Sequence, residues 1–391
     1  MKKSLLLTGV TASVLAMALT GCTPNNKASD GDGTISVSST ASECKLSTTE
    51  IKAGKVTFSV KNDGNQVTEF YVLAEDGLRI LSEVENIGPG ISRDLTVELA
   101  EGKYKTSCKP GMVGDGIMGD FTVTANPNAT SISQDEQKLR DTAVTQYASY
   151  VKDQVEQLKT QTDEFAAAYL AGDDETAKKL YPTARLHYER IEPVAESFGD
   201  LDPELDAREA DLEEGQQWSG WHMIEKDLWQ PTAEENDGKK YTPLTDAQRK
   251  EVAQKLQKDT QSLYDQTRNL NLTVDQIGNG AKSLLDEVTQ SKVTGEEEIW
   301  SHTDLSDFQG NVDGARVAFE DLRPIVESKD PELAKTLDER FDQTQKLLDQ
   351  HKDGDGFVSY QKLSKDQVRE LSDSIDALSE PLSKLTGVVV G

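Results

Sequence analysis

A tryptophan-rich segment carries the residues best suited to chemistry in this chain. Residues 217–229 read QWSGWHMIEKDLW. If the segment is helical, His222 and Glu225 are three residues apart and share a face, so an imidazole and a carboxylate can reach one cation. The same spacing also suits a histidine and a glutamate that only hydrogen-bond each other in a helix interface. The spacing alone therefore leaves both a metal site and a structural pair open.

Additional carboxylates would turn this pair into a metal site. A buried histidine–glutamate pair tolerates more carboxylates nearby only when a cation joins them, because uncompensated buried charge is costly. Asp259 and the run Glu296-Glu297-Glu298 are candidates for such extra ligands. Their spacing does not select among them.

The charge of the whole chain agrees with a cation as partner. The formal net charge is −28 at pH 7, which makes nucleic acid and anionic lipid surfaces poor partners. Most of the Asp and Glu residues serve solubility on either interpretation.

The first residues predict secretion and lipid anchoring. Lys2 and Lys3 precede an apolar run from Leu5 to Leu19 that is too short to span a bilayer but suits a signal-peptide core. The run ends in Leu-Thr-Gly-Cys22, which resembles the lipobox of bacterial lipoproteins. We therefore expect a signal peptide at 1–21, a lipidated Cys22 and a flexible polar tether at 22–34. The alternative is a soluble secreted protein with a fortuitous cysteine.

Two further cysteines, Cys44 and Cys108, lie in the part of the chain that we expect outside the cell. In an oxidising compartment two thiols either pair or hold a metal. Both options place them together.

The elements that must position these residues change in type along the chain. Between 35 and 125, apolar and polar residues alternate in short runs separated by turn signals such as Asn62-Asp63-Gly64, which predicts a β-sandwich. Asn126-Pro127-Asn128 then punctuates the chain. From 133 to 390 the pattern predicts an all-α domain, with stacked helical bundles as its natural architecture. The expected helices are 133–171, 174–198, 204–229, 245–269, 273–292, 296–327, 330–351 and 364–386.

Three motifs in order resemble one family. They are EPVAESFGD at 192–200, GWHMIEKDLW at 220–229, and GEEE at 295–298 leading to SHTDL at 301–305. They resemble the EfeO family, extracytoplasmic components of iron uptake systems, and the helical part is similar to imelysin-like domains with a His-x-x-Glu motif. The resemblance covers essentially the whole mature chain.

The resemblance implies a non-enzymatic iron-binding protein on the outer face of the cell membrane. Its metal would be held by His222 and Glu225, with Asp259 and Glu297 as the extra carboxylates. Oxygen donors plus one imidazole suit iron better than copper(I), although zinc would also bind. The family context implies two partners: an EfeU-like membrane iron permease that receives the iron, and an EfeB-like haem peroxidase.

The strand-rich part resembles a cupredoxin. Cys108 is followed by Lys-Pro-Gly-Met112, as in loops that carry copper ligands, but no histidine lies between 35 and 125, so a two-histidine copper centre cannot be built. The family implies instead a metal, iron or possibly copper or zinc, held by Cys44, Glu69 and Cys108. The alternative, which we favour slightly, is a Cys44–Cys108 disulfide that stabilises the sandwich by about 2–4 kcal/mol.

Two rival functions come from other classes. Imelysin-like domains have been classed with peptidases, which raises a zinc metallopeptidase, yet the chain lacks a His-Glu-x-x-His motif and its histidines are scattered. The other rival is a polysaccharide-binding module whose metal is only structural.

Two local patterns favour structural roles. Ser301-His302-Thr303-Asp304 predicts a hydrogen-bond cluster at a helix end or around the metal ligands, because neighbours on one turn cannot form a catalytic relay. The stretch 353–358 resembles part of an EF-hand loop, but Lys362 stands where a bidentate Glu is required, which indicates an acidic turn.

Overall fold

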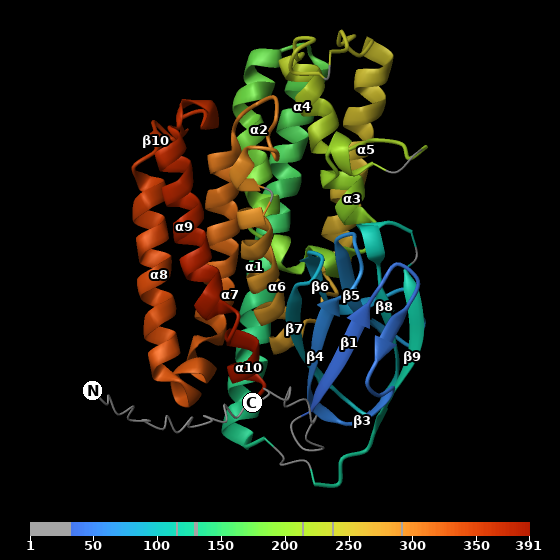
Figure 1. Ribbon diagram of the computed structural model, residues 1–391. Helices are drawn as coiled ribbons and strands as arrows, with labels where there is room; N and C mark the ends of the chain where they lie inside the picture. Colours follow the sequence, from blue (N-terminus) through green and yellow to red (C-terminus); the bar gives the residue numbers. More distant parts are fainter. Residues whose placement is uncertain (1–32, 115, 129–131, 213–214, 237, 291) are drawn as a thin grey trace, which may run out of the picture. The chain divides into compact units, whose positions relative to one another are not determined.

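The computed structural model describes residues 33–114, 116–128, 132–212, 215–236, 238–290 and 292–391 (Figure 1). The predicted signal peptide, Cys22 and all but the last residues of the predicted tether lie outside the described residues. Within the described ranges, no helix combines the length and apolarity needed to cross a bilayer.

The strand-rich part forms two sheets, as the alternating pattern predicts. One sheet has the order β2-β1-β4-β7 and the other β3-β9-β8-β5-β6. The strands are β1 Thr34–Ser39, β2 Cys44–Leu46, β3 Glu50–Lys52, β4 Gly54–Asn62, β5 Thr68–Ala74, β6 Ile80–Ile87, β7 Ser92–Leu99, β8 Gly102–Cys108 and β9 Ile117–Thr124. Most pairs are antiparallel, but β1 runs parallel to β4 and β3 parallel to β9.

The core of the sandwich follows from the period of two. In β4, Val56, Phe58 and Val60 are buried while the residues between them are more exposed. The Phe58 ring lies 5.1 Å from that of Phe70 and 5.4 Å from that of Phe121, measured between centroids. Strands from both sheets therefore share one aromatic core.

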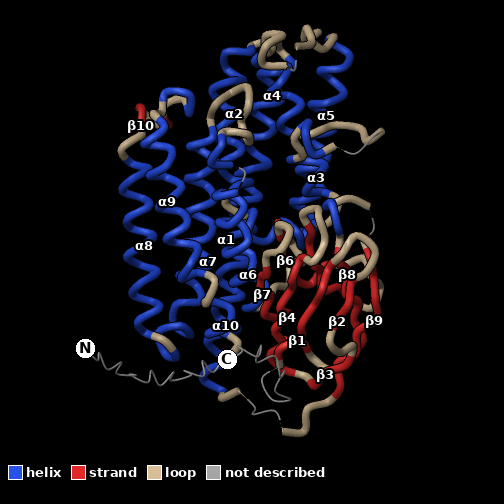
Figure 2. Tube along the Cα trace, viewed as in Figure 1, coloured by secondary structure: helices blue, strands red, loops and turns tan. Residues whose placement is uncertain are grey.

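Apart from the short strand pair β10 Lys352–Asp353 and β11 Gly356–Phe357, the regular elements in the rest of the described chain are helices, which confirms the predicted order of fold types (Figure 2). They are α1 Gln134–Leu170, α2 Asp174–Glu189, α3 Leu201–Asp206, α4 Trp221–Trp229, α5 Asp246–Thr267, α6 Val274–Gln290, α7 Asp304–Lys329, α8 Pro331–Asp349, α9 Lys365–Leu382 and α10 Leu385–Val389. Side-chain caps begin several of them: Ser133 accepts from the Glu136 amide, and Thr245 and Gln248 form a capping box.

Four expected helices differ from the structure. The segment expected at 296–327 is helical only from Asp304, and the segment expected at 364–386 is divided into α9 and α10. The other two are interrupted. The segment expected at 174–198 leaves the α-helix after Glu189 and continues as a 3₁₀ turn at Glu192–Phe198, which contains Pro193. The segment expected at 204–229 is instead the end of α3, a loop and α4. Gly220 has φ +87°, so a helix cannot run through it into α4.

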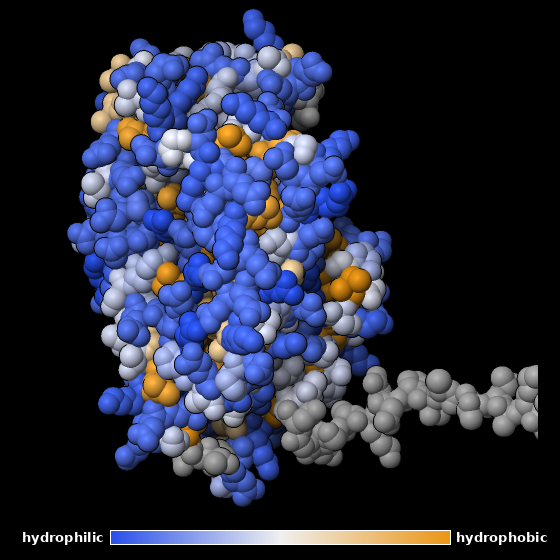
Figure 3. Space-filling model, turned by 90° about the vertical axis from the view of Figure 1, so that its left-hand side faces the viewer, coloured by the Kyte–Doolittle hydropathy of each residue, from blue (hydrophilic) through white to orange (hydrophobic). Residues whose placement is uncertain are grey.

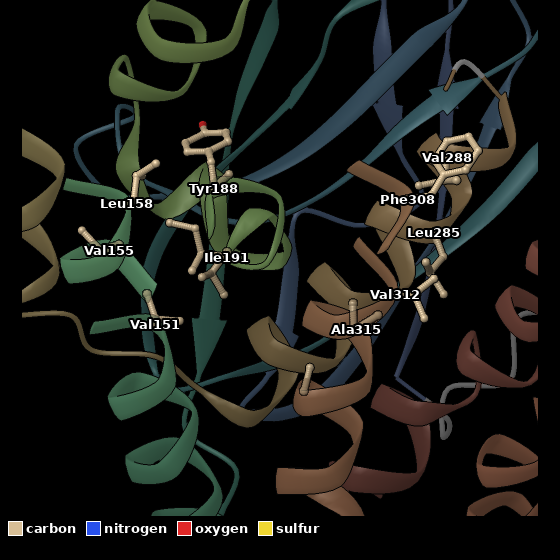
Figure 4. Packing of buried hydrophobic residues seen from close by; sticks show 14 of the residues in the cluster. Val151, Val155, Leu158, Tyr188, Ile191, Leu285, Val288, Phe308, Val312 and Ala315 are labelled. Carbon is tan, nitrogen blue, oxygen red and sulfur yellow. The ribbon is translucent and has the colours of Figure 1, made fainter. Parts of the chain in front are cut away.

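A close contact between α2 and α7 organises the helical core. A Cβ added to Gly310 on α7 would lie 2.4 Å from Cβ of Glu189 on α2, so only glycine permits this approach. Around it, side chains from α1, α2, α6 and α7 pack into a continuous apolar cluster, part of which Figure 4 shows around Val155, Ile191 and Val312. This close approach brings the polar residues of α2 and α7 near one another inside the apolar cluster.

Residues 33–391 form one compact unit. The face drawn in Figure 3 carries mostly hydrophilic side chains with apolar ones scattered among them, as expected of a strongly acidic chain. Helix α6 contacts β6 and β7, where the Asn279 side-chain amide donates to the Ser82 hydroxyl at 3.0 Å and to the Thr96 carbonyl at 2.8 Å.

Candidate metal centre

Helix α4 brings His222 beside the end of α3. His222 occupies the first turn of α4, two residues after Gly220. A Cβ at Gly220 would lie 2.1 Å from the carbonyl oxygen of Leu205, so glycine is required where the two helices meet. Because Asp206 follows Leu205, this contact sets the carboxylate of Asp206 next to the imidazole of His222.

The imidazole of His222 is 1% exposed and has carboxylates on both sides. Its Nδ1 lies 3.2 Å from Oε2 of Glu225. Its Nε2 lies 3.6 Å from Oδ1 of Asp206 and 3.7 Å from Oε1 of Glu297. Two groups of possible ligand atoms result: His222 with Asp206 and Glu297, and His222 with Glu225 and Glu298.

Glu225 and Glu298 are held by a turn that precedes α7. Oε1 of Glu225 accepts the backbone amides of Trp300 at 3.0 Å and Ser301 at 2.7 Å. Oε2 of Glu298 accepts the Ser301 hydroxyl at 2.5 Å, and the Glu298 amide donates to Asp304 at 3.2 Å. The motif at 301–304 therefore forms a hydrogen-bond cluster around these carboxylates.

Two buried cations compensate part of this negative charge. The guanidinium of Arg185, fully buried on α2, pairs with Asp206, with Glu189 at 2.5 Å and with Glu298 at 2.7 Å. Lys292 is also fully buried and contacts Glu189 at 3.1 Å and Glu192 at 2.8 Å.

Carboxylates outnumber cations in this buried network. Asp307 on α7 is fully buried, and within the described part of the chain neither of its carboxylate oxygens has a hydrogen-bond partner; the nearest nitrogen of Arg185 is 3.6 Å away. Leaving such a group charged and unpaired is costly. The ionised form of Asp307 therefore has no hydrogen-bonded partner among the described residues.

The local charges keep His222 protonated at neutral pH. Burial and the charge of Arg185 lower the pKa of its imidazole, but the contacts with Glu225 and Glu297 and the charge of Asp206 outweigh them and raise it to about 9. An ion that binds to this imidazole must displace a proton.

Several carboxyl groups in the network resist ionisation. Burial raises the pKa of Asp304 to about 7. Burial also raises the pKa of Glu298, with the nearby charge of Glu225 adding to it, and that of Asp307. Glu297 behaves differently: burial opposes it, but Lys292 and His222 hold its pKa well below the usual range, so it is an anion ready to bind a cation.

One imidazole with several carboxylates is a donor set that suits iron and also zinc. Of the other three histidines, His302 lies in the turn that holds Glu225 and Glu298, but its ring is hydrogen-bonded to Gln361. His187 is hydrogen-bonded to Gln161 and Gln154, and His351 follows α8. Neither group of ligand atoms around His222 contains a second histidine among the described residues.

The structure brings together three of the four residues expected at this centre, namely His222, Glu225 and Glu297. The fourth, Asp259, lies apart from them. It is buried on α5, where its carboxylate accepts from Lys255 at 2.7 Å, and it belongs to neither group of ligand atoms. Glu298, which belongs to the candidate run 296–298, also lies beside His222, and so does Asp206, which the sequence analysis did not name.

The expected pair in the sandwich, Cys44 and Cys108, is joined in a disulfide with an S–S distance of 2.05 Å. It links β2 of one sheet to β8 of the other. In this form the sulfur atoms are not thiolates, which are the form that binds metals. Glu69 is 4% exposed, and its carboxylate accepts the hydroxyl of Tyr71.

Aromatic side chains surround α4. Trp221 and Trp229 belong to the helix, Trp218 precedes it, and Trp300 packs against Trp218 with 5.9 Å between ring centroids. The ammonium of Lys226 lies over the rings of Trp300 and Trp218, at 5.0 and 5.8 Å. All four tryptophans of the chain thus lie on α4 or pack around Lys226 of this helix.

Comparisons with known proteins match both parts of the chain. The imelysin family model matches residues 143–385, and the cupredoxin-like domain model matches residues 11–123. The chain is 38% identical over 296 residues to an Efem/EfeO family lipoprotein of Staphylococcus haemolyticus, covering 75% of this chain and 98% of the relative. It is 35% identical over 358 residues to iron uptake system component EfeO of Escherichia coli and of Shigella flexneri, covering 91% of each sequence.

Proposed function

This chain belongs to the imelysin family and to the EfeO family of iron uptake components, and from that membership we propose that it captures iron outside the cell and delivers it to a membrane permease. The observation that supports iron capture is the buried centre of His222. There an imidazole and an excess of carboxylates converge with too few cations to compensate them.

The centre suits a cargo that must be released again. Arg185 and Lys292 already neutralise part of the buried charge in the absence of iron. The metal-free protein can therefore keep its fold, whereas a purely structural metal would leave the carboxylates unpaired on removal. The centre has a single imidazole, whereas the usual zinc peptidase motif supplies two histidines.

The remaining parts of the proposal concern location and partners. Cys22 would carry the lipid that anchors the chain to the outer face of the membrane, with 22–34 as tether. An EfeU-like permease would receive the iron, and an EfeB-like haem peroxidase would change its oxidation state. The relatives named as a lipoprotein and as iron uptake components support this assignment.

Isothermal titration tests iron capture directly. The mature chain with Cys22→Ser is titrated with ferrous iron without oxygen, with ferric citrate and with zinc, alongside His222→Ala. We expect the variant to lose at least about 100-fold in iron affinity, since ligand removal costs more than the 10–100-fold of a supporting residue.

His187→Ala is the matched control, because His187 is partly buried and hydrogen-bonded but lies away from the centre. It should bind iron like the parent chain. Unchanged iron affinity in His222→Ala would refute the location of the site. Zinc binding without iron binding, together with zinc-dependent peptide hydrolysis, would favour the peptidase alternative.

A further inference from the structure

Two tyrosines on α1 and an aspartate on α7 present buried polar atoms that lack hydrogen bonds. Tyr147 and Tyr150 are three residues apart on α1, with 5.9 Å between their ring centroids. Within the described residues, the hydroxyl oxygens of both tyrosines and Oδ2 of Asp321 are buried and have no hydrogen-bond partner. The side chain of Tyr147 is fully buried. In folded proteins such atoms generally bond to an ordered water or an ion. We call these three residues the α1–α7 trio.

Ion pairs and hydrogen bonds fix the register of α1 against α7 on either side of the trio. Lys329, at the end of α7, donates to Glu136 in the first turn of α1 at 2.8 Å. Further along α1, Arg190 joins Gln154 to Asp313 of α7, at 3.4 and 2.9 Å. The two helices therefore run antiparallel, and all three members of the trio lie between these links.

The carboxylate of Asp321 faces both phenols. Burial raises the pKa of Tyr147 and of Tyr150, and the charge of Asp321 adds to this rise in each case. Neither hydroxyl is hydrogen-bonded to the other or to Asp321, so one bound atom can contact all three groups. Tyr150 and Asp321 are only partly buried, which leaves the trio accessible from the surface.

The charges around the trio favour a cation. Three carboxylates, of Asp153, Asp313 and Asp321, act on the Tyr150 phenol together with the cation Arg190, which is already paired with Asp313. Burial raises the pKa of Asp321 to about 6, so its carboxyl group is still ionised at neutral pH.

The donor atoms of the trio are all oxygens, which hard cations prefer. A phenol becomes a strong ligand when it loses its proton, and a bound cation favours that loss. Iron(III), with its three positive charges, does so more effectively than a divalent ion. The trio thus suits ferric iron, whereas the imidazole of the His222 centre also suits ferrous iron and zinc.

We propose that Tyr147, Tyr150 and Asp321 form a second metal site, which binds iron(III) through two phenolates and one carboxylate. On binding, each phenol releases its proton to solvent, so one ferric ion displaces two protons and is neutralised by three anionic donors. The site shares no ligand with the His222 centre. The inference rests on the proposed function, which supplies iron as the cargo.

Visible absorption tests the site directly. Iron(III) bound to phenolate absorbs visible light by charge transfer from the ring, whereas iron(III) bound to imidazole and carboxylates does not give this band. The mature chain with Cys22→Ser is titrated with ferric citrate, against a ferric citrate blank, and with ferrous iron without oxygen. We expect the band with ferric iron only, and we expect it to persist in His222→Ala. Ferric binding without the band would overturn the proposal and leave water as the occupant of the trio.

Single substitutions in the trio locate the band. Tyr147→Phe, Tyr150→Phe and Asp321→Asn should each weaken ferric binding at the coloured step by at least about 100-fold, more than the loss of a supporting residue. The metal-free phenylalanine variants should melt no lower than the parent chain, because removing an unpartnered hydroxyl breaks no hydrogen bond. An unchanged band in both phenylalanine variants would refute the assignment.

Tyr104→Phe is the matched control. The Tyr104 hydroxyl donates to the carbonyl of Ala100 at 2.9 Å in the sandwich, so its removal changes a tyrosine far along the chain from the trio. The variant should keep the full band. Loss of the band in Tyr104→Phe would place the ferric phenolate site in the sandwich and contradict the proposal.

The two proposals fail in different ways. The ferrous titration and the colourless ferric step report the His222 centre alone. Iron binding that is entirely colourless and is lost in His222→Ala contradicts only the second site. A chain that binds neither ferrous nor ferric iron contradicts the proposed function as well.

Discussion

The chain contains two regions where acidic side chains are buried, and it compensates them in opposite ways. In the sandwich, Glu69 accepts a hydroxyl from Tyr71, and the neighbouring sulfur atoms are closed in a disulfide. In the helical part, the carboxylates around His222 rely on cations and remain in excess over them. The first region uses a neutral hydrogen-bond donor and a covalent link, whereas the second uses buried ion pairs.

The largest effect should come from removing the cation that compensates the helical cluster. Arg185→Met leaves Asp206, Glu189 and Glu298 without their shared partner, and breaking a buried ion pair from one side costs about 3–5 kcal/mol. Urea unfolding should show this loss, and added zinc should raise the melting temperature more in the variant than in the parent chain.

The matched control is Arg316→Met, whose guanidinium pairs with Glu320 and Asp342 at the surface. Its effect should stay below about 1 kcal/mol, as for exposed pairs in general. Equal losses in the two variants would mean that the buried cluster is not short of positive charge.

Breaking the disulfide should have the next largest effect and should be confined to the sandwich. Cys44→Ser with Cys108→Ser opens a cross-link between residues 64 apart in sequence and should cost about 2–4 kcal/mol by urea unfolding. Iron affinity at the helical centre should not change. A parallel loss of iron binding would show that the two regions depend on each other.

Reduction of the disulfide tests the metal site predicted for Cys44, Glu69 and Cys108. If the thiolates and the carboxylate hold an ion, the reduced chain binds one additional zinc by titration, and Glu69→Gln abolishes that increment. The oxidised chain is the control. The same zinc stoichiometry before and after reduction would leave the disulfide as the only role of the cysteines.

A smaller effect is the pH dependence of metal affinity. The raised pKa of His222, about 9, keeps its imidazole protonated at neutral pH, so binding there releases a proton. Zinc must displace one proton from the imidazole, and the proton concentration falls tenfold with each pH unit. Zinc affinity should therefore rise at least about tenfold per pH unit between pH 6 and 8. In His222→Gln the slope should be shallower by one proton. Equal slopes would contradict displacement of the imidazole proton.

The smallest effect belongs to Glu69. Burial raises the pKa of its carboxyl group, although the Tyr71 hydrogen bond and Lys109 oppose this. The folded state thus prefers the protonated form, and the stability that this preference contributes is present at low pH and lost as the pH rises through the folded pKa. Glu69→Gln, measured by urea unfolding, should stay within about 1 kcal/mol of the parent chain and compare more favourably at pH 7 than at pH 4.

The sequence predicts the order of fold types because local periodicity carries it. Alternation in β4 and the three-and-four spacing of the helices are properties of neighbouring residues. His222 and Glu225 are predictable for the same reason, since one helical turn joins them. The interruption at Gly220 is visible as a glycine, but only its contact with Leu205 shows why it is there.

The rest of the centre depends on contacts between distant segments. Asp206 reaches His222 because α3 ends where α4 begins, and no periodic pattern records that meeting. Asp259 shows the same limit: its acidity suggested a ligand, whereas in the structure its carboxylate pairs with Lys255, four residues earlier on the same helix face. In the sequence Arg185 is likewise an ordinary helical residue, and its role becomes visible only when α7 packs against α2.

The tryptophans around α4 provide an intrinsic fluorescence signal from this part of the protein. All four indoles stand within or against the helix that carries His222, and the sandwich contains none. Ultraviolet emission excited at the indole band therefore arises from residues on or around α4. A stopped-flow trace of its quenching by iron would follow loading and discharge in real time, without a dye and without interference from the sandwich.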